Sequence, residues 1–331
     1  MSKLTETWDY SDSYQWMDKA RGGFGPVIIT CAVCGGVQGK EAHSALPETP
    51  TEIAQAAYEA YNAGATAVHI HGRSPDNWAE CTNDPDVYRE INALVREKCP
   101  DIIINNTTGG GMGTTMEGRL ACLDARPEMA SLNLGPDMSR LVIPERPAPL
   151  PHPHPRLEVD DCIPFTYGII EGLAQKMKRN EVKPEMEIYH PGQYWVARDL
   201  MAGDLVNPPY VFQMVMGYQT SIYPTPQNLL AMVRELPAGS VFFAFGIGHF
   251  QLPMTTLAML VGGHVRVGLE DNLYHSKGRK FAGNGEAVER AARIARELNR
   301  EVATPAQARE ILGLSPAPRA YDRPEPPLVI A

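Results

Sequence analysis

The 331-residue sequence has no apolar run as long as the roughly 18 residues that a membrane-spanning helix needs. Its first 21 residues are polar and aromatic, and they lack the apolar stretch of a signal peptide. We therefore expect no membrane association and no export, and we predict a cytoplasmic location.

Positive charge is also scarce, since 30 lysines and arginines stand against 39 aspartates and glutamates and give a net charge of −9. Nucleic acids bind to basic surfaces, so we expect no nucleic-acid partner. There are only six cysteines, and the Cys-X-X-Cys pair of Cys31 and Cys34 has no second such pair with which to form a zinc site. In a chain of this length we expect free thiols that pack in the core.

The composition that remains is 44% hydrophobic and 21% charged, which is typical of a folded globular protein. Short apolar runs alternate with helical segments along most of the chain. Eight alternations in a chain of this length predict a (β/α)8 TIM barrel. An open doubly wound sheet is the alternative, but it usually has a glycine-rich phosphate turn directly after its first strand. The eight expected strands are residues 26–33, 66–71, 101–106, 129–134, 185–189, 210–216, 240–245 and 264–269.

We divide the chain into an N-terminal arm (1–25), a TIM-barrel catalytic domain (26–315) and a Pro-rich C-terminal tail (316–331). A long Pro-rich segment, residues 144–155, is predicted to be an insertion in one loop. The expected helices are residues 51–62, 84–98, 115–124, 167–180, 226–236, 254–261 and 285–299, with one more short helix from 304.

Two histidines, His69 and His71, end the second expected strand. Side chains at i and i+2 of a strand share one face and lie about 6.6 Å apart along the chain, so both imidazoles can bind one metal ion. Two hydrogen-bonded core histidines are the alternative. Glu270 follows the eighth expected strand, and strands two and eight of a barrel both flank strand one. Two histidines and a glutamate with an open position form a catalytic zinc pattern, so we predict Glu270 as the third ligand.

Other polar residues also stand at the C-terminal ends of the expected strands, where TIM barrels collect their functional groups. A buried Arg266 would need a carboxylate or an anionic ligand, and Asp271 is close to it in sequence. The glycine-rich run 107–113 offers backbone N–H groups that suit a phosphate or a carboxylate, although an ordinary turn is an equal alternative. Four further polar residues stand at expected strand ends, and each could equally be a structural cap or part of a functional site: Thr107, Ser131, Asn133 and Glu187.

Several segments together resemble the β-keto acid cleavage enzyme family, and the resemblance extends over residues 26–313. The most specific are the His-X-His-X-Arg motif at 69–73 and Gly-Gly-His-X-Arg-X-Gly-X-Glu-Asp-Asn at 262–272. The other matching segments are 29–35, 65–68, 106–110, 127–133, 184–187 and 303–310.

The resemblance implies a zinc-dependent barrel that condenses a β-keto acid with acetyl-CoA and forms acetoacetate and a new acyl-CoA. It also implies a homo-oligomer, usually a tetramer, and one Zn²⁺ per chain. By matching position, the metal ligands would be His69, His71 and Glu270, and the catalytic residues Asp271, Arg266 and Glu187. The substrate-binding residues would be Thr107, Thr108, Gly109, Gly110, Ser131, Asn133 and Val37.

Val37 departs from the family pattern, because members that act on an aminated keto acid have a glutamate at this position. Burying an ammonium group beside valine would cost several kcal/mol. We therefore expect a β-keto acid with a non-cationic tail, unless another residue, such as an aromatic side chain of the N-terminal arm, holds a cation. Two further hypotheses stay open: a metal-dependent barrel lyase or hydrolase that acts on a keto acid without coenzyme A, and a non-catalytic protein that binds a metal or a metabolite.

Overall fold

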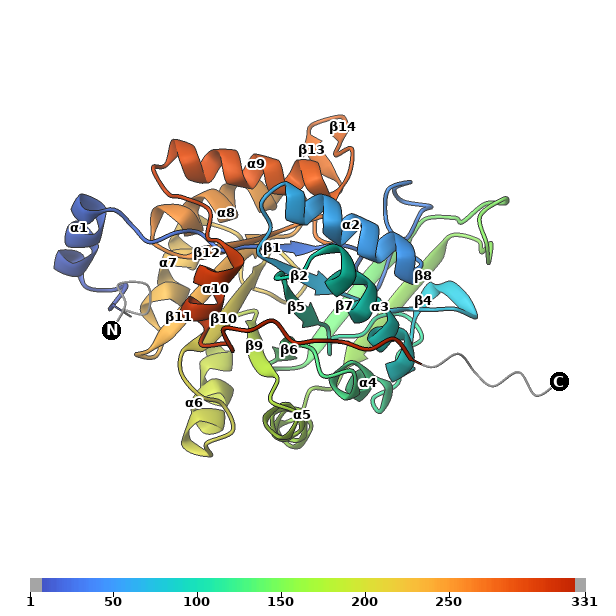
Figure 1. Cartoon of the computed structure of the whole chain (residues 1–331), viewed down its shortest axis with the longest axis horizontal. Coiled ribbons are helices and arrows are strands. Elements are labelled where there is room, and N and C mark those ends of the chain that lie inside the picture. The colour runs from blue at the N-terminus through green and yellow to red at the C-terminus, as the bar shows by residue number, and fades with distance from the viewer. Residues whose placement is uncertain (1–7, 325–331) are drawn as a thin grey trace.

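The computed structural model describes residues 8–324. Eight parallel strands form a closed barrel (Figure 1), and each of them overlaps one of the eight predicted runs, which confirms the predicted (β/α)8 architecture. The strands are β1 (Ile29–Ala32), β2 (Ala67–Ile70), β5 (Ile103–Asn106), β6 (Met129–Asn133), β9 (Lys183–Ile188), β10 (Tyr210–Met216), β11 (Ser240–Gly246) and β12 (His264–Val267). Strand β1 pairs with β2 on one side and with β12 on the other, as the metal prediction requires.

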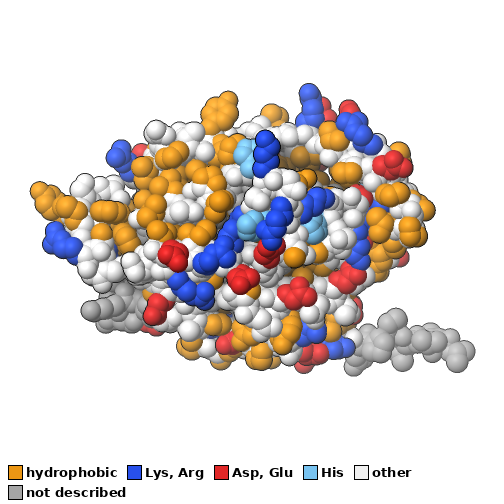
Figure 2. Space-filling view, turned by 90° about the horizontal axis from the view of Figure 1, so that it is seen from above, with side chains coloured by type: hydrophobic (Ala, Val, Ile, Leu, Met, Phe, Trp, Pro, Cys, Tyr) orange, Lys and Arg blue, Asp and Glu red, His pale blue; other side chains and the backbone are white. Residues whose placement is uncertain are grey.

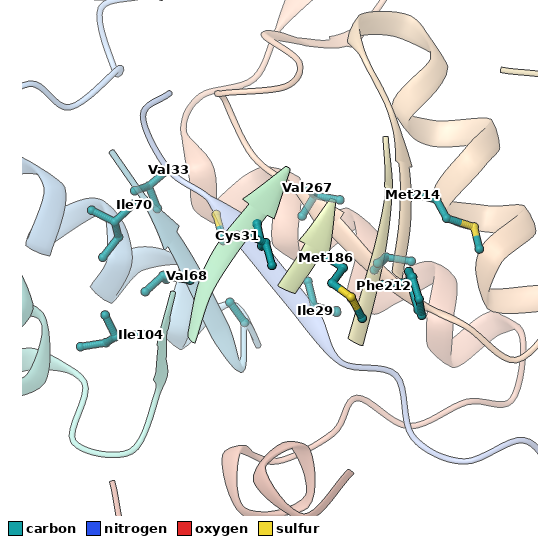
Figure 3. Close-up of a cluster of buried hydrophobic side chains, with 14 of the residues drawn as sticks. Ile29, Cys31, Val33, Val68, Ile70, Ile104, Met186, Phe212, Met214 and Val267 are labelled. Atoms are coloured by element: carbon teal, nitrogen blue, oxygen red, sulfur yellow. The ribbon is translucent and has the colours of Figure 1, made fainter. Parts of the chain in front are cut away.

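Side chains alternate between the two faces of each barrel strand. Val68 packs outward in the large cluster between the strands and the helices, part of which is drawn in Figure 3. Ala67 packs in the barrel interior, together with Ile311 and Leu312 of α10 (Pro305–Leu312), which fill the N-terminal end of the barrel. His69 stands two residues after Ala67 and therefore faces the same interior, toward the opposite end.

The helices surround the barrel, and several of them begin at side-chain caps. Helix α2 (Pro50–Asn62) starts with a capping box in which Thr49 and Glu52 bond to each other's backbone, and α10 starts in the same way. The further helices are α3 (Pro85–Lys98), α4 (Ala121–Asp124), α5 (Tyr167–Arg179), α6 (Tyr194–Ala202), α7 (Pro226–Arg234), α8 (Gln251–Leu260) and α9 (Asn284–Glu297), with 3-10 turns at Gly118–Leu120, Pro191–Gln193 and Gly248–Phe250. None of the helices within residues 8–324 is both long enough and apolar enough to cross a membrane.

The predicted helix 115–124 is wrong over its first half, where the chain forms turns. The backbone N–H of Thr115 donates to the side chain of Asn83, and the N–H of Gly118 donates to the Thr115 hydroxyl. Such side-chain bonds compete with a helix ladder. Helix α6 was not predicted. Two short hairpins, β3 (Arg73–Ser74) with β4 (Asn77–Cys81) and β13 (Tyr274–Ser276) with β14 (Arg279–Lys280), were also missed because they are too short to show a periodicity.

The N-terminal arm contains a helix, α1 (Ser13–Gly22), whose side chains are not buried. Figure 1 shows α1 set apart from the barrel. At the other end of the chain, residues 313–324 contain no regular secondary structure beyond turns. The first seven residues of the predicted arm and residues 325–331 of the predicted tail lie outside the described residues.

The predicted Pro-rich loop insertion, residues 144–155, is the tip of a longer β-hairpin. Strands β7 (Asp137–Ile143) and β8 (Leu157–Ile163) pair antiparallel on either side of it, and Arg146 bridges to His154 within the tip. The two strands were missed because charged residues interrupt their apolar alternation (DMSRLVI and LEVDDCI). The predicted loop insertion is therefore present, as the tip of a two-stranded ribbon between β6 and α5.

A buried ion cluster anchors this hairpin to the segment after β1. Nη1 of Arg146 lies 2.7 Å from Oε2 of Glu41 and 2.7 Å from Oε1 of Glu48, and Nη2 lies 2.9 Å from Oε2 of Glu48. All three side chains are almost fully buried. The tip of the hairpin is therefore fixed across the mouth of the barrel.

Arg146→Met is expected to lower the free energy of unfolding by about 3–5 kcal/mol, because it leaves two carboxylates buried without their cation. Denaturant titration measures the change. The control is Arg140→Met on β7. Its partner Asp160 lies 3.0 Å away and both side chains are exposed, so this change should cost at most about 1 kcal/mol. Equal losses for the two variants would contradict the anchoring role of Arg146.

Candidate active site

The three predicted metal ligands meet at the C-terminal end of the barrel. His69 comes from β2, His71 follows that strand, and Glu270 lies in the loop after β12. Oε1 of Glu270 lies 3.7 Å from Nε2 of His69 and 3.3 Å from Nε2 of His71. One ligand atom from each of the three side chains lies within 4.8 Å of the others. The strand pairing β2–β1–β12 brings them together, as the sequence predicts.

These three side chains fit a divalent metal ion. Oε2 of Glu270 is buried and has no hydrogen-bond partner, so it is free to accept a further ligand. Burial and the charge of Arg266 hold the pKa of His69 well below its ordinary value, which keeps this imidazole neutral as a ligand must be. Burial opposes the ionisation of Glu270, but the charges of Arg266 and His71 hold its pKa well below the ordinary value. Burial also opposes the protonation of His71, but Glu270 raises its pKa to about 9, so a bound metal ion would displace a proton from this imidazole. Two imidazoles and an ionised carboxylate are a donor set typical of zinc.

Arg266 on β12 organises three carboxylates beside this cluster. Its Nε and Nη2 donate to the two carboxylate oxygens of Asp271, both at 2.9 Å. Its Nη2 also donates to Glu270 at 2.5 Å, and its Nη1 donates to Glu187 at 3.2 Å. The guanidinium lies 4.6 Å from the ring centre of Phe245. The predicted pairing of Arg266 with Asp271 is present.

The two catalytic carboxylates of the prediction differ in their protonation. Burial raises the pKa of Asp271 to about 6, against the lowering effect of Arg266. Burial raises the pKa of Glu187 to about 8, again against Arg266. At neutral pH Asp271 is therefore mostly ionised and can accept a proton, whereas Glu187 is mostly protonated and can donate a hydrogen bond.

The glycine-rich run after β5 forms one side of the site. Thr107, Gly109 and Gly110 line the cavity, and the Thr107 hydroxyl accepts a bond from the N–H of Gly109 at 2.9 Å. A Cβ at Gly36, on the loop after β1, would collide with the backbone carbonyl oxygen of Gly110, so only glycine allows the two loops to approach this closely. Turns separate the run from α4, although the sequence predicts a helix from residue 115.

Two of the predicted substrate-binding residues lie beneath the cavity instead of in its wall. The Thr108 hydroxyl donates to the backbone carbonyl of Ser131 at 2.6 Å, and the Thr108 N–H donates to the Ser131 hydroxyl at 3.1 Å. These two hydrogen bonds join the ends of β5 and β6 and hold the glycine-rich run in place. Asn133 does line the cavity, where its side-chain oxygen accepts a bond from Tyr189 at 3.2 Å. Val37 lines the cavity from the loop after β1.

Apart from Thr108 and Ser131, the predicted site residues line one cavity of about 650 Å³ at the mouth of the barrel. The hairpin β7–β8 supplies a wall of this cavity that the sequence did not reveal. These cavity-lining side chains could not be identified from the sequence, because nothing in a single sequence indicates which long connection folds over the mouth of the barrel. They include Asp137, Ser139, Leu141, Ile143, Val159, Asp161 and Ile163.

The chain is similar to known proteins over most of its length. A sequence model described as beta-keto acid cleavage enzyme matches residues 26–314. The 3-keto-5-aminohexanoate cleavage enzyme of Fusobacterium nucleatum is 38% identical over 288 residues, which cover 87% of this chain and 98% of that protein. The 3-dehydrocarnitine:acetyl-CoA trimethylamine transferase of Rhizobium meliloti is 32% identical over 300 residues, covering 87% and 97%.

Among solved structures, the apo structure of ObcA has the same fold, with a TM-score of 0.62 at 19% identity. The match covers 81% of this chain and 65% of the ObcA chain, so this chain spans less than two thirds of that structure.

Proposed function

The chain belongs to the beta-keto acid cleavage enzyme family, and from this premise we propose that it converts a β-keto acid and acetyl-CoA into acetoacetate and a new acyl-CoA. The observation that carries the proposal is the arrangement in one cavity of His69, His71 and Glu270 beside the bidentate pair of Arg266 and Asp271. The reaction needs a polarised keto acid and a base within reach of it, and this cavity offers both.

The proposal includes one Zn²⁺ per chain, held by His69, His71 and Glu270. When bound there, zinc supplies Lewis-acid stabilisation of negative charge on the oxygens of the keto acid. The neutral state of His69 and the ionised state of Glu270 support this assignment.

We assign the proton transfer to Asp271, which would take a proton from the carbon between the keto and carboxylate groups of the substrate. Arg266 fixes the orientation of Asp271 by donating to both of its oxygens, and each oxygen keeps a lone pair for the proton. That carbon then attacks the carbonyl of acetyl-CoA and releases the thiolate, which adds to the original keto carbon. The bond between the keto carbon and the deprotonated carbon breaks, so that the keto carbon becomes the thioester carbonyl of the new acyl-CoA. The acetoacetate carbanion takes the proton back from Asp271. Glu187 accepts a hydrogen bond from Nη1 of Arg266, the nitrogen that does not contact Asp271. In its protonated state Glu187 can donate a hydrogen bond to a substrate oxygen.

The substrate's carboxylate and keto groups would bind at Thr107, Gly109 and Gly110, where a hydroxyl group and glycine backbone line the cavity. Asn133 would add a side-chain contact on the same side. In this assignment Thr108 and Ser131 are positioning residues, because their mutual hydrogen bonds support the glycine-rich run from below.

A panel of β-keto acids tests the proposed reaction, with acetoacetate as the readout. We expect acetoacetate to form only when acetyl-CoA is present, together with one equivalent of the new acyl-CoA. Loss of keto acid at the same rate without acetyl-CoA would favour the metal-dependent lyase or hydrolase. Binding of substrate without turnover across the panel would favour the non-catalytic protein.

The remaining parts of the proposal concern the whole chain. We propose that residues 26–315 form the catalytic domain, with an arm before it and a tail after it, and that the enzyme is a cytoplasmic homotetramer. All six cysteines are free and five are buried, which suits a reducing compartment.

Trp195 and Tyr223 are 73% and 80% exposed, which is unusual for large aromatic side chains and typical of subunit interfaces. On the face in Figure 2, Lys and Arg side chains lie among Asp and Glu, and we propose no nucleic-acid partner.

A further inference from the structure

The hairpin β7–β8 turns acidic side chains toward the active-site cavity. Ser139 on β7 stands opposite Asp161 on β8, and Asp137 stands opposite Ile163. Directly opposed residues of antiparallel strands share a face, as do residues two apart on one strand. Asp137 and Asp161 therefore lie on the same face of the ribbon, and both line the cavity.

Asp137 has an unsatisfied carboxylate oxygen. Its Oδ1 is buried and has no hydrogen-bond partner. Burial raises the pKa of Asp137 to about 6, and the nearby charge of Arg119 opposes this rise only in part. At neutral pH a mostly ionised carboxylate thus faces the cavity with its charge poorly compensated, which is costly unless a ligand supplies the partner.

Arg119, whose charge lowers the pKa of Asp137, also lines the cavity. Its Nη1 donates to the backbone carbonyls of Thr108 and Gly109, so it holds the glycine-rich run. Its guanidinium also lies 5.4 Å from the ring centre of Phe165. The carboxylates of Asp137 and Asp161 together outnumber this one cation in the outer part of the cavity.

Two aromatic rings accompany Asp137. Tyr189 and Tyr218 both line the cavity, and their ring centres are 6.2 Å apart. Burial raises the pKa of Tyr218 to about 12, and the charge of Asp137 adds to the rise, as it does for Tyr189. Both phenols therefore stay neutral. Aromatic rings that line a cavity together with a carboxylate can attract a cation, including an alkylated ammonium that cannot donate hydrogen bonds.

A chain of contacts links this acidic and aromatic region to the reacting groups. The Tyr189 hydroxyl lies 3.5 Å from Oε2 of Glu187, whose Oε1 accepts a bond from Arg266. The same hydroxyl donates to Asn133, four residues before Asp137. A keto acid bound at the metal cluster can thus extend its tail past Tyr189 toward Asp137.

We propose that Asp137, flanked by Tyr189 and Tyr218, binds an ammonium or alkylated ammonium group in the tail of the β-keto acid. This inference rests on the proposed cleavage reaction and names the substrate class for it. It reverses the expectation of a non-cationic tail, which was drawn from Val37 and considered only the loop after β1. The negative charge that Val37 does not provide comes from the hairpin wall of the same cavity.

The test compares kcat/KM for β-keto acids of equal length with ammonium, trimethylammonium, neutral and carboxylate tails, at a fixed acetyl-CoA concentration. We expect the wild-type enzyme to prefer a cationic tail over the neutral one by at least about tenfold. Asp137→Asn should reduce this preference by about tenfold or more. The matched control is Asp160→Asn on the solvent side of β8, where Asp160 pairs with Arg140, and it should keep the wild-type preference.

Several outcomes would overturn the inference. A wild-type preference for the neutral or carboxylate tail would do so, and this measurement does not depend on the folding of any variant. An equal loss by Asp137→Asn for all tails would show a structural role only. If no tail gave acetoacetate with the wild-type enzyme, the proposed function itself would fail, whereas acetoacetate from non-cationic tails alone would leave the function standing.

Discussion

Replacing His69 and His71 together by alanine is expected to remove the bound metal and to lower the rate of acetoacetate formation by at least about 10²–10³-fold. Both imidazoles lie within 4 Å of Oε1 of Glu270, so the double change leaves a single carboxylate from the ligand cluster. The loss reflects several kcal/mol of Lewis-acid stabilisation at about 1.4 kcal/mol per tenfold. Metal analysis of the purified protein and the initial rate of acetoacetate formation measure the two effects.

A matched control for this double variant is His249→Ala. His249 is exposed in the 3-10 turn after β11 and takes no part in the ligand cluster. The His249→Ala variant should keep the metal content and the rate of acetoacetate formation of the wild-type enzyme. Thermal unfolding of both variants separates loss of metal from loss of fold. Metal content unchanged from wild type in a folded His69→Ala/His71→Ala protein would remove these residues from the metal site.

Asp271→Asn is expected to keep the metal and the fold but to lower kcat by about 10²–10⁴-fold, the usual contribution of a general base. The carboxamide has almost the same shape as the carboxylate, but it cannot accept the substrate proton. It also turns an N–H toward Arg266 and so loses one of the two 2.9 Å hydrogen bonds. The measurements are kcat, with metal content and thermal stability as controls.

The interpretation of Asp271 depends on separating its two roles. Ser139→Ala is a useful reference, because Ser139 lines the same cavity from the hairpin and is not a proton acceptor in the proposal. A near-normal kcat for Asp271→Asn with normal metal content would leave Asp271 as a partner of Arg266 and nothing more.

The barrel and the metal cluster could be predicted because both follow from short-range patterns. Most barrel strands are runs of apolar, often β-branched residues, and the two histidines stand two positions apart on one such run. The position of Glu270 then follows from the fixed neighbours of strand one in a barrel. Local sequence and one topological rule were therefore sufficient for these ligands.

The hairpin wall could not be predicted, because its role depends on contacts between distant segments. Arg146 is 105 residues from Glu41 and 98 residues from Glu48, yet these contacts set the hairpin across the mouth of the barrel. Asp137 reaches the cavity only through this placement. The same limit explains Thr108 and Ser131: the sequence places them at strand ends but does not show that they bond to each other below the cavity.

The most direct test of the central claim follows the carbon atoms of the reaction. Acetyl-CoA labelled with ¹³C in both acetyl carbons is incubated with the enzyme and an unlabelled β-keto acid, and the products are identified by NMR and mass spectrometry. The proposed reaction places the label in C3 and C4 of acetoacetate and leaves the new acyl-CoA unlabelled, in equal amounts. Unlabelled acetate or unlabelled acetoacetate, formed while the labelled acetyl-CoA stays intact, would contradict the proposal.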